Sequence, residues 1–178
     1  ERAKKLKVAE KHSMKGLKMH VVVACILRCQ LIGDNVGIPL PILIQYMNKA
    51  LKRSMEKRVR LSISLELFET YRTDSKKGIK TYLKKIFPKC YNDLDPENLI
   101  DFTAYGIFKM DRQTVFRTRR IAKNTWNDGE NGNFPDTTSP SIVAIGALFT
   151  MCVIKKISVN YSVFGLSKVR LAAAYKTI

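Results

Sequence analysis

Apolar residues recur at spacings of three and four along most of this chain, whereas alternation of apolar and polar residues is rare. Spacing of three and four puts side chains on one face of an α-helix, while alternation is typical of a half-buried strand. The sequence therefore predicts an all-α fold built from short helices.

Helix boundaries are marked by local signals. Asp95-Pro96 and Ser139-Pro140 each combine an N-cap residue type with a proline at the first helical position. The stretch 127–139, "NDGENGNFPDTTS", is rich in Gly, Asn and Asp, which predicts a loop. The predicted helices cover residues 16–29, 41–53, 75–87, 95–108, 111–126, a segment that starts at residue 140, and 166–178.

The charge balance is strongly basic. Lys and Arg number 32 against 15 Asp and Glu, which gives a formal net charge of +17. Such an excess gives at least non-specific adhesion, and it favours a polyanion partner such as nucleic acid. Residues 49–60 hold six cations and one acid, and residues 112–123 hold five cations and no acid. Aromatic residues do not interleave these clusters in the pattern of single-strand stacking platforms, so the pattern favours duplex DNA over single strands.

The remaining chemistry-bearing residues exclude several classes of protein. Cys25, Cys29 and Cys152 lie in apolar runs, which predicts free buried thiols and a reducing compartment. A zinc site with His20 is disfavoured because no second cysteine pair exists. No apolar run approaches the ~20 residues that span a membrane. No nucleophile or phosphate-loop motif accompanies the two histidines, so we expect no catalysis.

The chain also contains a weak internal repeat. Ser167-Lys168 matches Ser75-Lys76 at an offset of 92 residues, and each pair opens a basic helix. The apolar runs "HVVVACILRC" and "PSIVAIGALFTM" precede them at an offset of about 120, which implies an insertion of about 28 residues in the first copy. We therefore expect two repeats, residues 1–90 and 91–178, with the insertion near 34–57 packed outside the first.

The order of elements in the second copy resembles the second cyclin-like repeat of the transcription factor IIB family. The stretches "SKKGIKTYLKKI" and "HSMKGLKMHVVVACILRC" resemble parts of the first repeat. The triplet Ile121-Ala122-Lys123 stands where the family commonly has a similar triplet. The matching residues of the second repeat are Pro140, Ile142, Val143, Ala144, Gly165, Ser167, Val169, Tyr175, Lys176 and Ile178.

The resemblance implies a nuclear initiation-factor core without enzymatic activity. Such a core bridges the TATA-binding protein, double-stranded promoter DNA and RNA polymerase II. It binds no small-molecule substrate and no membrane. It implies no cofactor here, because the family's zinc ribbon would lie in an N-terminal part that precedes this chain. The abrupt helical start "ERAKKLKVAEKH" accordingly suggests a fragment of a longer protein.

The resemblance also assigns site residues. Lys76, Lys77 and Lys80 would face acidic residues of the TATA-binding protein. In the final helix, Lys168 suits a phosphate, Val169 a thymine methyl group, and Arg170 a phosphate or a guanine edge. The candidate DNA-binding residues are Ser167, Lys168, Val169, Arg170, Lys155, Lys156, Arg117 and Arg120. Ala172 stands where the family has a base-reading arginine, so we expect mainly contacts to the DNA backbone.

Three other functions stay open at this stage. The same core could serve RNA polymerase III, or the fold could be that of a cyclin that activates a kinase. An unrelated basic helical adaptor is the third alternative. A cyclin has no need of a +17 charge, and binding to a complex of the TATA-binding protein with DNA would separate the initiation factors from the rest.

Overall fold

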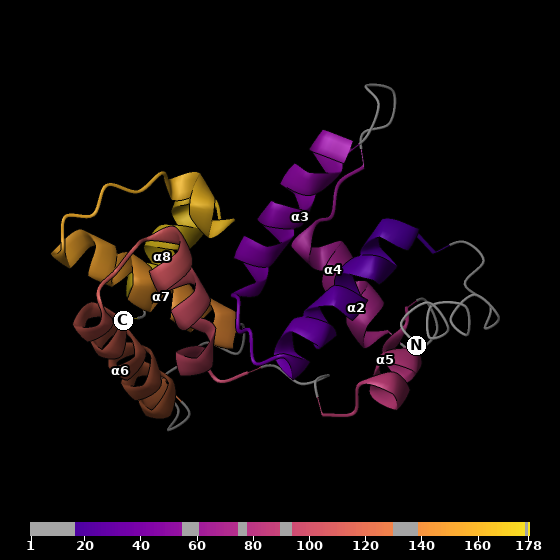
Figure 1. The fold of residues 1–178 in the computed structure, drawn as a ribbon, viewed down its shortest axis with the longest axis horizontal. Helices are drawn as coiled ribbons and strands as arrows, with labels where there is room; N and C mark the ends of the chain where they lie inside the picture. The colour runs from indigo at the N-terminus through magenta and orange to yellow at the C-terminus, as the bar shows by residue number, and fades with distance from the viewer. Residues whose placement is uncertain (1–16, 55–60, 75–77, 90–93, 130–138, 177) are drawn as a thin grey trace.

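The computed structural model describes residues 17–54, 61–74, 78–89, 94–129, 139–176 and 178. Within these ranges the chain is helical and has no strand, which confirms the predicted all-α class (Figure 1). The α-helices are α2 (Met19–Gly33), α3 (Leu40–Ser54), α4 (Leu65–Thr73), α5 (Lys80–Ile86), α6 (Arg112–Asp128), α7 (Pro140–Ile154) and α8 (Lys168–Lys176). Shorter turns are the 3-10 helices η1 (Pro96–Leu99) and η4 (Tyr161–Phe164) and the π-helix η2 (Phe102–Ile107).

The helices form two groups, one on either side of α3 (Figure 1). The first group contains α2, α4 and α5, and its core includes Val21, Phe68 and Leu83. In the second group α7 packs against α6, α8 and η1, and its core includes Leu148 and Phe164. The described residues therefore form two hydrophobic cores, whereas an internal repeat of the whole fold stays a prediction.

Helix α3 contributes to both cores. Leu40, Leu43 and Ile44 belong to the first core, while Ile42 lies fully buried in the second. The backbone N–H of Leu40 also donates to Ser141 Oγ in the first turn of α7, at 3.1 Å. Apolar side chains on two faces of α3 thus reach two cores. The expectation that residues 34–57 pack outside a shared repeat stays a prediction, as does the insertion itself, because the repeat is not shown.

Gly165 fixes how closely α3 approaches the second group. It ends η4 with a left-handed backbone, at a φ of 68°, that suits glycine better than any other residue. A Cβ at this position would also collide with the backbone carbonyl of Pro41 at the start of α3. Both requirements favour glycine at the contact between the two groups.

The apolar helices α2 and α7 end in the same way. Each has 15 residues, and the residue after its C-cap, Asn35 or Lys156, is left-handed. The next backbone N–H then bonds to the carbonyl five residues back, which together with the left-handed residue defines a Schellman motif. These bonds run from Val36 N to Leu31 O at 2.8 Å and from Ile157 N to Cys152 O at 2.9 Å.

Two predicted helix starts differ from the structure. Residues 95–108 form η1 and then η2 instead of one α-helix, and neither Asp95 nor Ser139 makes a side-chain cap bond. Within this segment Ile100, Ala104 and Phe108 are all buried at spacings of four. On an α-helix, side chains four residues apart differ in direction by about 40° around the helix axis. A π-turn has more residues per turn, so it brings side chains at this spacing closer to one line. Packing against the second core therefore accounts for the wider turn.

Candidate nucleic-acid interface

Helix α8 is anchored on α7 through its inner face. Leu171 and Ala174 are buried, and the backbone carbonyl of Ala174 passes so close to Gly146 that a Cβ there would collide with it. At the start of the helix, Ser167 Oγ accepts the backbone N–H of Arg170 at 3.3 Å. Ser167 therefore caps the final helix.

The outer face of α8 carries the predicted contact residues. Lys168, Val169 and Arg170 are all exposed, and Val169 is 81% exposed. At about 100° per residue, Lys168 and Arg170 lie on opposite sides of Val169. The exposed Ala172 and Ala173 fall between the cations and the valine. The surface is thus a strip of small apolar residues with one cation along each edge.

Lys155 and Lys156 lie at the C-terminus of α7 and are exposed. This end of α7 lies near the start of α6, where Asp111 accepts the Thr114 hydroxyl at 2.6 Å and the Thr114 backbone N–H at 2.9 Å. The two Thr114 bonds, and to a smaller degree the charge of Lys155, hold the pKa of Asp111 below its usual value. The charge of Lys155 therefore acts on an acid that the sequence did not connect with it.

Helix α6 positions Arg117 and Arg120 on its exposed side. Two other cations of the same cluster are paired instead. Arg119 meets Asp101 at 3.5 Å, and Lys123 meets Glu97 at 3.3 Å. Both acids come from the η1–η2 segment, so the local count of residues 112–123 overstated the local positive charge.

The remaining cations of α6 surround an exposed aromatic ring. Phe116 is 66% exposed and lies one turn from Arg112 and Arg120. Among the described residues, Arg112, Arg117 and Arg120 have no ion pair. The sequence did not single out Phe116, although its place between cations on a polar helix face was a readable signal.

The residues predicted to meet the TATA-binding protein are only partly described. Lys76 and Lys77 lie outside the described residues. Lys80 is the first residue of α5, directly after the buried Ile79, and is partly exposed. The structure thus places one of these three lysines, and it does not bring Lys80 together with α8.

A buried arginine is the main feature of the first core that sequence reasoning missed. Arg28 is only 6% exposed, and burial lowers its pKa, with a further contribution from the nearby charge of Arg72. Arg72 in turn pairs with Glu69 at 2.8 Å. The signal was a single cation inside the apolar run "ACILRCQ".

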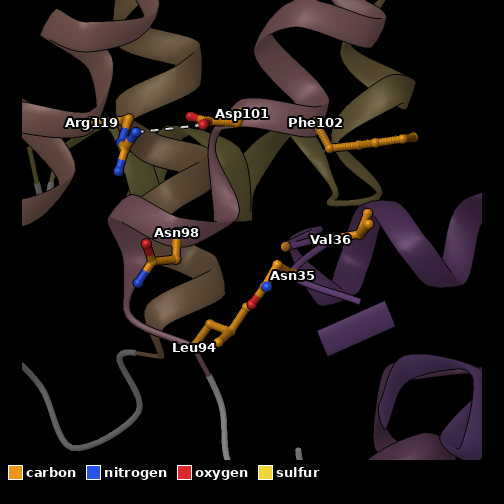
Figure 2. A pocket seen from close by; sticks show the side chains of 8 residues that line it. Asn35, Val36, Leu94, Asn98, Asp101, Phe102 and Arg119 are labelled. Atoms are coloured by element: carbon orange, nitrogen blue, oxygen red, sulfur yellow. Dashed lines mark hydrogen bonds and ion pairs between the residues drawn. The ribbon is translucent and has the colours of Figure 1, made fainter. Parts of the chain in front are cut away.

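A polar pocket of about 380 Å³ opens where the loop after α2 meets η1 and η2 (Figure 2). Figure 2 shows Asp101 turned toward Arg119 and Phe102 pointing away from that pair. Asn35 and Asn98 add neutral amides to its wall. Across the described ranges, no group of three or more His, Cys, Asp or Glu lies together as a metal site would require.

Burial of the thiols agrees with the sequence. Cys25, Cys29 and Cys152 are free and buried, and burial raises the pKa of both Cys25 and Cys152 to about 12. In the part of the chain that the structure describes, every helix is too short or too polar to cross a lipid bilayer.

Comparison with known proteins does not identify a relative. No protein-family model matches the chain, and no curated protein or solved structure is significantly similar to it. The function must therefore be argued from the residues and their geometry.

Proposed function

We propose that this chain is the core of a general transcription initiation factor that bridges the TATA-binding protein, promoter DNA and RNA polymerase II, without catalysis. Its two halves would be cyclin-like repeats. The observation that carries the proposal is the outer strip of α8, in which Val169, Ala172 and Ala173 are flanked by Lys168 and Arg170.

This strip suits the major groove of duplex DNA. Small side chains in the middle allow the helix backbone to come close to the base edges, and Val169 offers a contact for a thymine methyl group. Cations on both edges can reach phosphates of the two strands that border the groove. Because the family's arginine is replaced by Ala172, this proposal predicts mainly backbone contacts with weak sequence preference.

Other features support the same proposal. Lys155 and Lys156 place further positive charge at the end of α7, and Arg117 and Arg120 do so on α6. The shared length and shared C-terminal motif of α2 and α7 support a repeated architecture. The overall charge of +17 agrees with a polyanionic partner.

A gel-shift series across salt concentrations tests the DNA contact. Lys168→Ala should weaken binding to all duplexes and lower the salt slope by about one. If Arg170 reads a guanine, Arg170→Ala should cost ~1–3 kcal/mol and relax the preference at one position. If Arg170 meets a phosphate, its loss should instead resemble that of Lys168.

Lys85→Ala is a matched control, because Lys85 is an exposed lysine on α5 in the other half. It should change the affinity much less than either α8 variant. If the Lys168→Ala, Arg170→Ala double variant binds every duplex as well as wild type does, the α8 contact is wrong.

A second gel shift tests the protein partner. The double variant Lys76→Glu, Lys77→Glu should weaken recruitment to a complex of the TATA-binding protein with DNA, and Lys80→Glu should weaken it further. Exposed pairs contribute only about 0–1 kcal/mol each, but charge reversal adds repulsion. Unchanged recruitment by the triple variant would mean that these lysines do not contact the TATA-binding protein, and absence of recruitment of wild type would refute this partner.

The choice of polymerase needs a separate measurement. The same core in an RNA polymerase III factor would give the same results in both gel shifts. Reconstituted initiation with each polymerase separates the two, and we expect activity with RNA polymerase II. A cyclin would instead stimulate a kinase and would bind neither duplex DNA nor the TATA-binding protein complex.

A further inference from the structure

An apolar groove lies where the two groups of helices meet. It has a volume of about 350 Å³, and its walls come from α3 and the preceding loop on one side and from η2 on the other. We call it the junction groove, and its lining residues are Ile38, Leu43, Tyr46, Phe102, Gly106 and Ile107. None of these residues belongs to the proposed DNA contact.

The walls of the junction groove expose large aromatic surfaces. Tyr46 is 44% exposed and Phe102 is 46% exposed. A contiguous apolar patch with a polar rim is typical of an interaction site. A bulky apolar side chain of a partner would remove this aromatic surface from water.

Positive charge borders the groove on α3. Lys49 Nζ lies 5.5 Å from the centre of the Tyr46 ring, which makes a cation–π contact at the edge of the groove. Arg53 follows Lys49 by four residues and therefore lies on the same side of the helix. Measured around the helix axis from Tyr46, Arg53 lies about 20° away and Lys49 about 60° away. Lys52, by contrast, lies about 120° away from Tyr46, beyond Lys49. An occupant that extends along α3 would meet two cations in sequence.

We propose that the junction groove binds a short acidic segment of a partner protein, which inserts one bulky apolar side chain beside Tyr46 and Phe102 and sets its carboxylates against Lys49 and Arg53. Charge complementarity selects an acidic partner, and the apolar walls select a protein over nucleic acid. Duplex DNA has no bulky apolar side chain to fill such a groove.

Gly106 allows the groove to be filled without disturbing the fold. A Cβ at this position would have no neighbouring atom within 4 Å, and its backbone φ is not left-handed. A leucine at position 106 would therefore extend into open space at the groove. Gly106→Ala is the matched control, because it adds a Cβ but leaves most of the groove open.

The test uses the full chain and a labelled peptide of glutamates and alanines around one Phe-Leu pair, followed by fluorescence anisotropy. Gly106→Leu should weaken peptide binding by about tenfold or more, as expected for the loss of a central apolar anchor. Lys49→Glu with Arg53→Glu should weaken it comparably, and a peptide with both apolar residues changed to alanine should lose most of its affinity. Gly106→Ala and Lys52→Glu should change it by no more than about twofold.

Three results would overturn the inference. Wild type could fail to bind the peptide, Gly106→Leu could bind it as well as wild type does, or Lys52→Glu could weaken binding as much as the other reversals. The last result would mean general attraction between charges. Thermal melting by circular dichroism must show that Gly106→Leu is folded, and a variant that fails this is replaced by Tyr46→Ala, for which the same weakening is expected.

The groove and the DNA contact are distinguished by one further measurement. Gly106→Leu should bind duplex DNA like wild type, whereas the double alanine variant of Lys168 and Arg170 should still bind the peptide. If filling the groove abolishes DNA binding and leaves peptide binding intact, the groove belongs to the DNA surface and the acidic segment is the wrong occupant.

Discussion

Helices α2 and α7 are alike as sequences but unlike in their surroundings. Both have 15 residues, both are rich in apolar residues, and both end in a Schellman motif. Every residue from 143 to 148 in α7 is buried. In α2, however, Met19, Val23 and Leu27 form an exposed row at spacings of four.

The difference comes from the neighbouring elements. Helix α7 packs against α6, α8 and η1, so almost its whole circumference is covered. Helix α2 packs mainly against α4, which covers one side. Two apolar helices of the same length can thus contribute very different amounts of buried surface, because burial depends on what surrounds a helix as well as on its own residues.

The largest predicted effect tests this difference directly. Leu27 and Leu148 are each the ninth residue of their helix, but Leu27 is 39% exposed and Leu148 is fully buried. Leu148→Ala should lower the free energy of unfolding by about 2–5 kcal/mol, because it removes buried methyl groups and leaves a cavity. Leu27→Ala should cost about 1 kcal/mol or less. Urea denaturation of both variants measures the two values, and equal losses would mean that α2 is as fully covered in solution as α7.

A second prediction concerns the contact between the two halves. Gly165→Ala should destabilise the protein by about 1–2 kcal/mol from the left-handed backbone alone. The collision with the Pro41 carbonyl adds to this and should separate α3 from the second group. Thermal melting should show a lower transition temperature, and Gly106→Ala, which meets no neighbour, should melt like wild type. An unchanged melting temperature for Gly165→Ala would contradict the close approach of α3.

A third prediction compares the two Schellman motifs. Lysine adopts the left-handed region less readily than asparagine does, so Lys156 is under more strain than Asn35. Lys156→Gly should therefore raise the free energy of unfolding by up to about 1 kcal/mol, and Asn35→Gly by only a few tenths. Urea denaturation midpoints provide the test. A larger gain for Asn35→Gly would show that the two ends are not equivalent.

The smallest effect concerns the helix caps of the two halves. Asp111 caps α6 with a carboxylate, while Ser64 caps α4 by accepting the Leu67 N–H at 3.1 Å. Because the folded pKa of Asp111 is lowered, its stabilisation is present above the unfolded value of about 3.9 and is lost as the pH falls through the folded value.

Asp111→Asn can keep the cap but cannot titrate. The stability advantage of wild type over this variant should therefore shrink as the pH is lowered from about 5 to about 2. Denaturation curves across this range measure it. An advantage that stays constant would mean that the carboxylate is not stabilised by its bonds to Thr114.

Much of the local structure could be predicted because its causes lie within a few residues. Helices α6 and α8 begin at or within two residues of the predicted starts 111 and 166, and the cysteines of the apolar runs are buried. Regular apolar spacing likewise predicted the helices around Ile44 and Leu83. The resemblance assigned Lys168, Val169 and Arg170 at the start of the final helix as candidate contact residues, and all three are exposed.

Contacts between distant segments could not be predicted in this way. The pairing of Arg119 with Asp101, the approach of Pro41 to Gly165 and the junction groove all join parts of the chain that the sequence separates. Sequence alone therefore determined the helical class, the basic charge and the exposed cations of α8, since these depend on local periodicity and composition. Only the tertiary structure decided that α3 serves both cores, that residues 102–107 widen into a π-helix and that α7 is enclosed where α2 is not, because burial depends on which neighbours the folded chain brings together.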